Sequence, residues 1–357
     1  MQVTLANWRT APFNRWAFHH VRELIPTADI AHGAQVRALP QASRDLGLEA
    51  FLRETDTDGM AVLQRGRLVF EHYAGGMSAQ TPHILMSVSK SMLGVLFHEL
   101  GLEADQAVEK VIPELASTAY RGVSIRQLLD MRAGIVWDEN YLAASGPIVE
   151  YRKSTGWNPS DGASDLHSFY QSLKDAGSHG GPVHYVSPNS DLLGWIIERA
   201  SGRRYADLMS EHVWKPIGAE RSAYITVDRL GAPRCAGGMC ATLRDLARAG
   251  QWLIEARPQF LEDLARGDAQ AWSAGDLAQY FPGLPMRYRQ QWYTLDAAKG
   301  EKAAPLVFGW GIHGQFLFVD RANQIVIAKL SSQALPIDVA RNALTLRAVS
   351  QLRKFLA

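Results

Sequence analysis

Cysteine, net charge and long apolar runs are the scarce features of this sequence. Among 357 residues the only cysteines are Cys235 and Cys240, too few for a disulfide scaffold and too isolated for a zinc site. The formal net charge is +1 at pH 7, which gives no electrostatic reason to expect nucleic acid or an anionic membrane as a partner. No stretch reaches the roughly 18 apolar residues of a membrane span. The N-terminus also lacks a basic region followed by an apolar run, so we expect a cytoplasmic protein.

The motifs of several enzyme classes are missing as well. The sequence contains no G-x-S-x-G, no H-E-x-x-H and no P-loop, which argues against an α/β-hydrolase elbow, a zinc peptidase and a nucleotide-phosphate loop. His19 and His20 are adjacent and would face different sides of a helix, so they do not indicate a metal site. Residues 309–314 fit G-x-G-x-x-G, but a strand-like alternation follows them where a dinucleotide site needs a helix. We expect no cofactor and no metal, and we expect these glycines to let the backbone approach another strand or a substrate.

Hydrophobic periodicity places strands near both ends of the chain and helices between them. Hairpins are expected at 60–70 and 315–328, and helices at 41–53, from Ser87 onward, at 242–253 and at 337–355. The pattern predicts an α/β (α+β) fold, in which helices flank an antiparallel sheet closed by both chain ends and a mainly helical domain adjoins it. We place the sheet domain at 1–86 and 216–357 and the helical domain at 87–215, with the active site at their junction.

A serine and a lysine three residues apart open an apolar helical segment. Ser87 and Lys90 share one helix face, with Cβ atoms about 5–6 Å apart. Ser87 would lie in the first turn, where free N–H groups and the positive end of the helix dipole gather. A lysine kept from water there has a lowered pKa and can accept the serine proton. One S-x-x-K by chance is about an even bet in a chain of this size, so the pair needs support from elsewhere.

That support comes from Tyr185 and Ser187, which precede a second apolar helix. A tyrosine pressed against a lysine ammonium ionises more readily and can relay a proton between a serine and a leaving group. Ser187 is placed to hydrogen-bond Lys90 or the substrate. Taken alone, Tyr185 is more often a packed aromatic than a base, but its position after Ser87 and before the glycine-rich strand favours a catalytic role.

Together with Ser124–Leu129, Asp191–Gly194 and Gly237–Met239, these segments resemble the serine β-lactamase and penicillin-binding-protein superfamily over roughly residues 45–357. The three added segments look most like its class C and esterase branch. The resemblance implies a serine β-lactamase-like fold. Two features depart from the β-lactam enzymes, because the Y-x-N motif reads Y-x-S and the K-T-G strand motif is absent. The Y-x-S variant and the strand Gly-Ile-His-Gly-Gln look most like the 6-aminohexanoate-dimer hydrolases, amidases of nylon oligomers that also retain carboxylesterase activity.

The resemblance also implies roles for individual residues. Ser87 would be the nucleophile, with Lys90 and Tyr185 as the proton-transfer pair. Backbone N–H groups of Ser87 and Ile312 would form the oxyanion hole, and Ser187 would assist in the polar network.

Two further substrate-binding residues follow from the same resemblance. Tyr141 lies on a loop like one that closes over substrate in that family, and Gly311 precedes the oxyanion-hole residue. His313, next along the chain, would point away from Ile312 on an alternating strand, which favours a structural role.

The implied reaction is hydrolysis of a linear amide or ester through a Ser87 acyl-enzyme. The sequence leaves other activities open: a short-chain carboxylesterase without useful amidase activity, a D-aminopeptidase, or a weak β-lactamase. In β-lactam enzymes the K-T-G lysine helps to hold the substrate carboxylate, so its absence argues against efficient β-lactam turnover. An inactive ligand sensor is the alternative that is not an enzyme. The expected partner is a small-molecule amide or ester, without nucleic acid or membrane, and a homodimer remains an open alternative.

Overall fold

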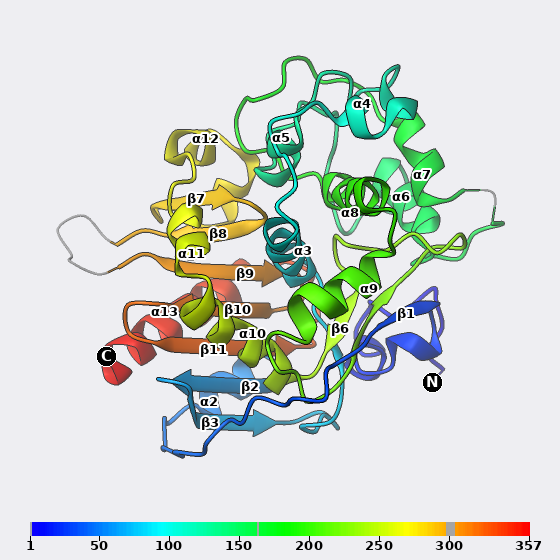
Figure 1. Cartoon of the computed structure of the whole chain (residues 1–357). Helices are drawn as coiled ribbons and strands as arrows, with labels where there is room; N and C mark the ends of the chain where they lie inside the picture. The colour runs from blue at the N-terminus through cyan, green and yellow to red at the C-terminus, as the bar shows by residue number, and fades with distance from the viewer. Residues whose placement is uncertain (1, 163, 298–303) are drawn as a thin grey trace.

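A seven-stranded sheet forms the centre of the computed structural model, which describes residues 2–162, 164–297 and 304–357 (Figure 1). The strand order is β3-β2-β11-β10-β9-β8-β7, and all neighbours are antiparallel. The strands are β2 (Thr57–Gln64), β3 (Arg67–Tyr73), β7 (Met286–Arg289), β8 (Trp292–Leu295), β9 (Leu306–Gly311), β10 (Gln315–Asp320) and β11 (Ile325–Ser331). Because β2 pairs with β11, segments from both ends of the chain close one sheet, as the sequence predicts.

The two hairpins expected from the sequence are β2–β3 and β10–β11. The first turns through Arg65 and Gly66, with φ of 49° and 73°. A two-residue type I′ turn requires positive φ at both central residues, and its twist matches that of the flanking strands. Gly66 adopts this conformation without steric cost.

Alternate residues of the strands supply two apolar layers, one on each face of the sheet. On β10, Phe316 and Phe318 join one buried cluster, whereas Leu317 and Val319 join the other. A strand with both faces buried has no polar side, which is why β10 is apolar throughout its centre. The helices that cover the sheet are α10 (Leu243–Ala256) and α11 (Pro258–Leu264) on one face, and α2 (Glu49–Glu54) and α13 (Val339–Leu356) on the other (Figure 1).

A smaller antiparallel sheet, in the order β1-β5-β6-β4, lies beside the start of the nucleophile helix. Its strands are β1 (Thr27–Ile30), β4 (His83–Ile84), β5 (Ala223–Thr226) and β6 (Met239–Ala241). Sequence periodicity did not predict these strands, because runs of two to four residues are too short to show alternation. β4 nevertheless matters, since the chain enters Ser87 directly from it.

Between residues 88 and 214 the described part of the chain holds helices, loops and isolated bridges, without a strand. The α-helices are α3 (Val88–Glu99), α4 (Val108–Val111), α5 (Ile125–Leu129), α6 (Pro147–Ser154), α7 (Leu166–Phe169), α8 (Ser187–Ser201) and α9 (Tyr205–Met209). α3 contacts β8, β9 and β10 as well as α8, so it lies between the large sheet and the other helices (Figure 1). Elsewhere the short helices are α1 (Asn14–Ala17) and α12 (Ala269–Ser273). None of the helices in the described ranges is long and apolar enough to cross a bilayer.

One expected helix is mostly absent. The sequence predicts a helix over 41–53, but only Glu49–Glu54 is helical. The backbone of 40–44 instead bonds to the free edge of β3, where Leu68 N–H donates to Pro40 and Ala42 N–H donates to Leu68. An unpaired strand edge offers a row of such groups, and these tertiary bonds replace the local helical ones.

Candidate active site

Ser87 is the N-cap residue of α3, at the point where the chain leaves β4. Met86, just before it, has φ of 45°, a conformation that non-glycine residues seldom adopt. Such backbone strain is typical of functional sites, where the surrounding structure holds it in place. Lys90 lies one turn further on the same helix and is 1% exposed. The predicted position of Ser87 in the first turn, beside a buried lysine, therefore matches the structure.

The Lys90 amine contacts three oxygen atoms. Its Nζ lies 2.9 Å from Ser87 Oγ, 3.2 Å from Ser187 Oγ and 2.7 Å from the carbonyl oxygen of Ala236. Burial lowers the pKa of Lys90 from 10.5 to about 7, with Glu139 acting against the shift. A large fraction of Lys90 is therefore neutral near pH 7. Its lone pair can then accept the Ser87 proton while its two N–H groups donate to the other two oxygens.

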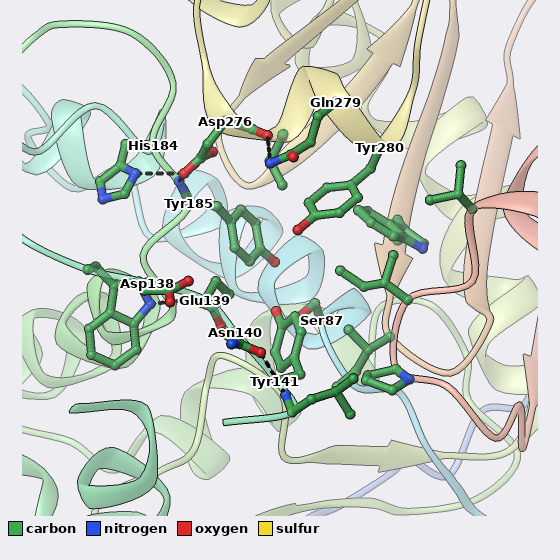
Figure 2. Close-up of a pocket in the computed structure, with 18 residues that line it drawn as sticks. Ser87, Asp138, Glu139, Asn140, Tyr141, His184, Tyr185, Asp276, Gln279 and Tyr280 are labelled. Atoms are coloured by element: carbon green, nitrogen blue, oxygen red, sulfur yellow. Dashed lines mark hydrogen bonds and ion pairs between the residues drawn. The ribbon is translucent and has the colours of Figure 1, made fainter. Parts of the chain in front are cut away.

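Tyr185 lies over Lys90, with Nζ 4.8 Å from the ring centroid. The ring is 4% exposed, and the backbone N–H donates to the carboxylate of Asp276 at 3.2 Å. Burial raises the pKa of the Tyr185 phenol, and a hydrogen bond with Ser87 opposes this rise. Tyr185 is therefore harder to ionise than a free tyrosine, contrary to the prediction from the sequence, because desolvation outweighs the favourable contacts. Tyr185 is a neutral phenol beside Ser87 and can donate a proton (Figure 2).

Ser187 connects Lys90 to a carboxylate that the sequence analysis missed. Its Oγ donates to Glu139 Oε1 at 2.5 Å, and its N–H donates to Glu139 Oε2 at 3.0 Å. Since Ser187 is the first residue of α8, Glu139 also lies at the positive end of that helix dipole. A single glutamate in a loop-rich segment forms no motif, so nothing in the sequence marked it.

β9 brings the chain segment 309–312 against the start of α3. A Cβ atom at Gly311 would lie 2.9 Å from Ser87 N, and one at Gly309 would lie 2.7 Å from Ser91 Oγ. Glycine alone permits this approach. We expected these glycines to let the backbone approach another strand or a substrate. The structure shows that they instead let β9 approach the start of α3. Ile312 follows directly and lines the cavity that contains Ser87.

His313 lies in the turn between β9 and β10, not on the strand where the sequence placed it. Its φ is 62°, and the buried ring donates from Nδ1 to the carbonyl of Gln333 at 2.7 Å. Burial lowers the pKa of His313 to about 4, so the ring is neutral. These contacts fit the structural role expected for it.

A cavity of about 660 Å³ opens above Ser87 (Figure 2). Tyr141 and Tyr185 line it, so the structure brings both predicted residues to Ser87. The rest of its wall comes from two segments that lie within the ranges 137–157 and 258–300 expected to build the substrate pockets, and from the chain around β9 and before α13. The residues concerned are 137–142, Asp276, Leu277, Gln279, Tyr280, Trp310, Pro336, Ile337 and Val339. His184 hydrogen-bonds Asp276 at 2.6 Å on the same wall.

A second, narrower cavity of about 30 Å³ shares Ser87, Glu139, Tyr141 and Ile312 with the first. Ser187 lines this second cavity. Gly311, predicted as a substrate-binding residue, lines neither of the two and instead backs the Ser87 amide.

Only one group of described residues has the arrangement of a cation site. His19, Asp58 and His83 are buried, and their ligand atoms lie within 4.8 Å of one another. His83 Nε2 is 3.3 Å and His19 Nε2 is 3.9 Å from Asp58 Oδ2. Burial lowers the pKa of His19 to about 4, so this imidazole is neutral. None of the three lines either cavity at Ser87, so the group is separate from the candidate catalytic residues.

Comparison with known proteins agrees with this geometry. A family model described as beta-lactamase matches residues 48–351. The chain belongs to the beta-lactamase family. Within it, the 6-aminohexanoate-dimer hydrolase of Paenarthrobacter ureafaciens is 36% identical over 354 residues, covering 93% of this chain and 88% of the relative. These two findings confirm the resemblance seen in the sequence and identify a serine hydrolase of amide or ester bonds.

Solved structures share the family fold. One from Bacillus anthracis, provisionally named a 6-aminohexanoate-dimer hydrolase, has a TM-score of 0.87 and 24% identity, covering 99% of this chain and 97% of that one. EstCE1, a hydrolase with promiscuous acyltransferase activity, has a TM-score of 0.65 and 18% identity, covering 85% and 96%. At these identities the likeness concerns the fold, and it confirms the predicted serine β-lactamase-like architecture.

Proposed function

We propose that the chain hydrolyses linear amides and esters through an acyl-enzyme on Ser87, with Lys90 and Tyr185 moving the protons. The observation that carries this proposal is the buried Lys90 amine, 2.9 Å from Ser87 Oγ. A lysine whose pKa is lowered to about 7 is matched to proton transfer near neutral pH.

In the first step, Ser87 Oγ attacks the substrate carbonyl carbon while neutral Lys90 takes its proton. The negative charge that forms on the carbonyl oxygen is stabilised by the backbone N–H groups of Ser87 and Ile312. When the tetrahedral intermediate collapses, Tyr185 donates its phenolic proton to the leaving nitrogen or oxygen. The proton held by Lys90 then returns to Tyr185, so both groups are neutral again in the acyl-enzyme.

Water completes the reaction by the reverse route. As the water attacks the acyl carbon, the Tyr185 hydroxyl receives a proton from it and passes its own proton to neutral Lys90. Lys90 then returns this proton to Ser87 Oγ as the serine leaves. Ser187 and Glu139 hold the Lys90 amine in position throughout. Ser187 Oγ accepts a hydrogen bond from Lys90 Nζ and donates one to the Glu139 carboxylate.

The name of the 36% identical relative supports a linear amide as one substrate class. A short-chain carboxylesterase without useful amidase activity is the second candidate, because both reactions use the same three side chains. Turnover of N-ethylpentanamide compared with that of ethyl pentanoate, two neutral substrates with the same acyl group, separates these two. Useful hydrolysis of nitrocefin would instead favour the β-lactamase alternative, which the missing K-T-G lysine disfavours.

Covalent labelling tests the mechanism itself. A fluorophosphonate should add one adduct to the wild-type protein by intact mass spectrometry, and peptide mapping should place it on Ser87. Ser87→Ala should take up no label and lose ester hydrolysis while keeping the wild-type circular dichroism spectrum. A wild-type protein that takes no label and hydrolyses no ester would point to the sensor alternative.

A further inference from the structure

The narrow cavity beside Ser87 has an unusual wall. Arg9, Arg152 and Arg234 all line it, from the N-terminal segment, from α6 and from the loop before β6. We call this cavity, bounded by the three arginines together with Ser87 and Ile312, the arginine pocket. A volume of about 30 Å³ accommodates roughly two water-sized groups, which is the size of the two oxygens of a carboxylate.

Positive charge in this pocket exceeds negative charge. Arg234 is paired with Asp191, whereas Arg9 and Arg152 form no ion pair with any carboxylate among the described residues. Arg152 donates to the carbonyl of Tyr141 at 2.8 Å, and Arg9 donates to the side chain of Asn158. Two guanidinium groups beside the nucleophile are thus left without an ion-pair partner, and the three arginines on this wall face one carboxylate, Glu139.

The arginines also act on one another. Burial together with the charges of Arg152 and Arg234 lowers the pKa of Arg9 to about 9. Arg234 likewise contributes to the lowered pKa of Arg152, in addition to burial. The Nε atoms of Arg9 and Arg234 are buried without a hydrogen-bond partner among the described residues. A bound anion would offset this repulsion and accept hydrogen bonds from the unpaired groups.

The carboxylate of Glu139, also on this wall, forms no ion pair with the arginines, although its charge partly offsets those of Arg152 and Arg234. Its oxygens accept hydrogen bonds from Ser187 Oγ, Ser187 N–H and Trp137 Nε1. Aromatic rings hold the guanidinium groups in place, since Arg9 and Arg234 lie 5.7 Å and 4.9 Å from the Trp157 ring centroid. The donors are therefore set in position before a ligand arrives, which lowers the entropic cost of binding one.

The position of Tyr185 assigns this pocket to one half of the substrate. The leaving group must meet the proton donor Tyr185, which lines the larger cavity but not the arginine pocket. The leaving group therefore occupies the larger cavity. The acyl group, on the other side of the carbonyl carbon, then extends towards the arginines.

We propose that the arginine pocket binds a carboxylate at the far end of a short acyl group, so that the preferred substrates are monoamides or monoesters of short dicarboxylic acids. This inference rests on the proposed acyl-enzyme mechanism and adds the charge and size of the acyl group. Hydrolysis breaks the acyl C–N or C–O bond, water supplies the new oxygen, and the products are a dicarboxylate and an amine or alcohol.

Three esters of matched size test the proposal. Monoethyl glutarate carries the acid on the acyl side, the pentanoyl ester of glycolic acid carries it on the leaving side, and ethyl pentanoate is neutral. For the wild-type protein we expect kcat/KM for monoethyl glutarate to exceed that for ethyl pentanoate by about 10- to 100-fold, the range that hydrogen bonds to charged groups provide. The glycolate ester should gain no such advantage.

Variants then test whether the arginines cause the preference for monoethyl glutarate. In Arg152→Gln the ratio of kcat/KM for monoethyl glutarate to that for ethyl pentanoate should fall about tenfold, and Arg152→Lys should restore part of it. Arg199→Gln removes an arginine that pairs with Glu114 on the surface, and it should change neither the ratio nor the activity. Thermal unfolding reports whether each variant is folded, and Arg9→Gln replaces Arg152→Gln if that variant is not.

Each outcome has a distinct meaning. Equal kcat/KM for the three esters, with Ser87 still labelled by a fluorophosphonate, overturns the arginine pocket but leaves the proposed function intact. A preference for the glycolate ester overturns the assignment to the acyl side. A wild-type preference that Arg152→Gln and Arg9→Gln leave unchanged shows that other groups bind the carboxylate. Absence of both labelling and hydrolysis overturns the proposed function itself.

Discussion

Lowering the pH below 7 should reduce the activity, because it protonates one group, the Lys90 amine. The reaction needs the neutral amine, because only that form has a lone pair for the Ser87 proton. Burial lowers the pKa of Lys90 from 10.5 to about 7. Activity should therefore be present above this pKa and decrease as the pH falls through it, the opposite of an enzyme that needs a protonated lysine.

The size of the effect follows from that pKa. With a value of about 7, the neutral fraction is about 9% at pH 6, 50% at pH 7 and 91% at pH 8, so kcat/KM should rise about tenfold from pH 6 to pH 8. The profile of kcat/KM reports the free enzyme, in which no substrate yet alters the burial of Lys90. Ethyl pentanoate followed in a pH-stat is the suitable assay, because this substrate does not titrate.

His184 is the group most able to mimic this profile. It lines the larger cavity, and its hydrogen bond to Asp276 raises the pKa of the imidazole above its usual 6.5. In His184→Asn the inflection near pH 7 should persist, whereas Lys90→Met should have no measurable activity at any pH. A flat wild-type profile between pH 6 and pH 8, or an inflection that disappears in His184→Asn, would refute the assignment of Lys90 as the base.

Three other predictions concern the surroundings of this pair. Glu139→Gln should move the inflection to lower pH, because it removes a charge that raises the pKa of Lys90; an inflection that moves up would contradict the geometry. Gly311→Ala places a methyl group 2.9 Å from Ser87 N. We expect kcat to fall by about 10²–10³, the effect of losing one oxyanion-hole donor, while circular dichroism shows a retained fold. An unchanged kcat would exclude an oxyanion hole formed by the Ser87 and Ile312 N–H groups. Dialysis against EDTA should leave kcat unchanged, because the cluster around Asp58 lies apart from both cavities; a loss that zinc restores would give that cluster a role in activity.

The parts of the site that the sequence predicts are those fixed by local spacing. Ser87 and Lys90 lie one helical turn apart, so any helix that begins at Ser87 brings them together. The hairpin turn at Gly66 and the strand at 315–320 are likewise local, since turn chemistry and alternation each involve only a few consecutive residues. Tyr185 was indicated by its order along the chain and by the family resemblance, because no local rule connects it to a serine almost a hundred residues earlier.

The parts that the sequence missed depend on tertiary contacts. Glu139 matters only because α8 begins beside it, and its loop shows no pattern that predicts this. The three arginines lie at positions 9, 152 and 234, on segments whose sequences give no reason to converge. The pKa of Tyr185 was predicted in the wrong direction because its degree of burial, which decides the sign, is a property of the whole fold.

The missing K-T-G motif and the arginine pocket together move positive charge from the strand beside the nucleophile to the narrow cavity. In β-lactam enzymes of this superfamily a lysine on the strand beside the nucleophile helps to hold a substrate carboxylate. Here that strand has a glycine at Gly309, packed so closely on α3 that a Cβ atom would lie 2.7 Å from Ser91 Oγ. The unpaired cations instead lie in the narrow cavity, at Arg9 and Arg152. A carboxylate attracted to them would orient the scissile carbonyl with its acyl side towards the arginines, so the same Ser87 and Lys90 would act on substrates of a different shape.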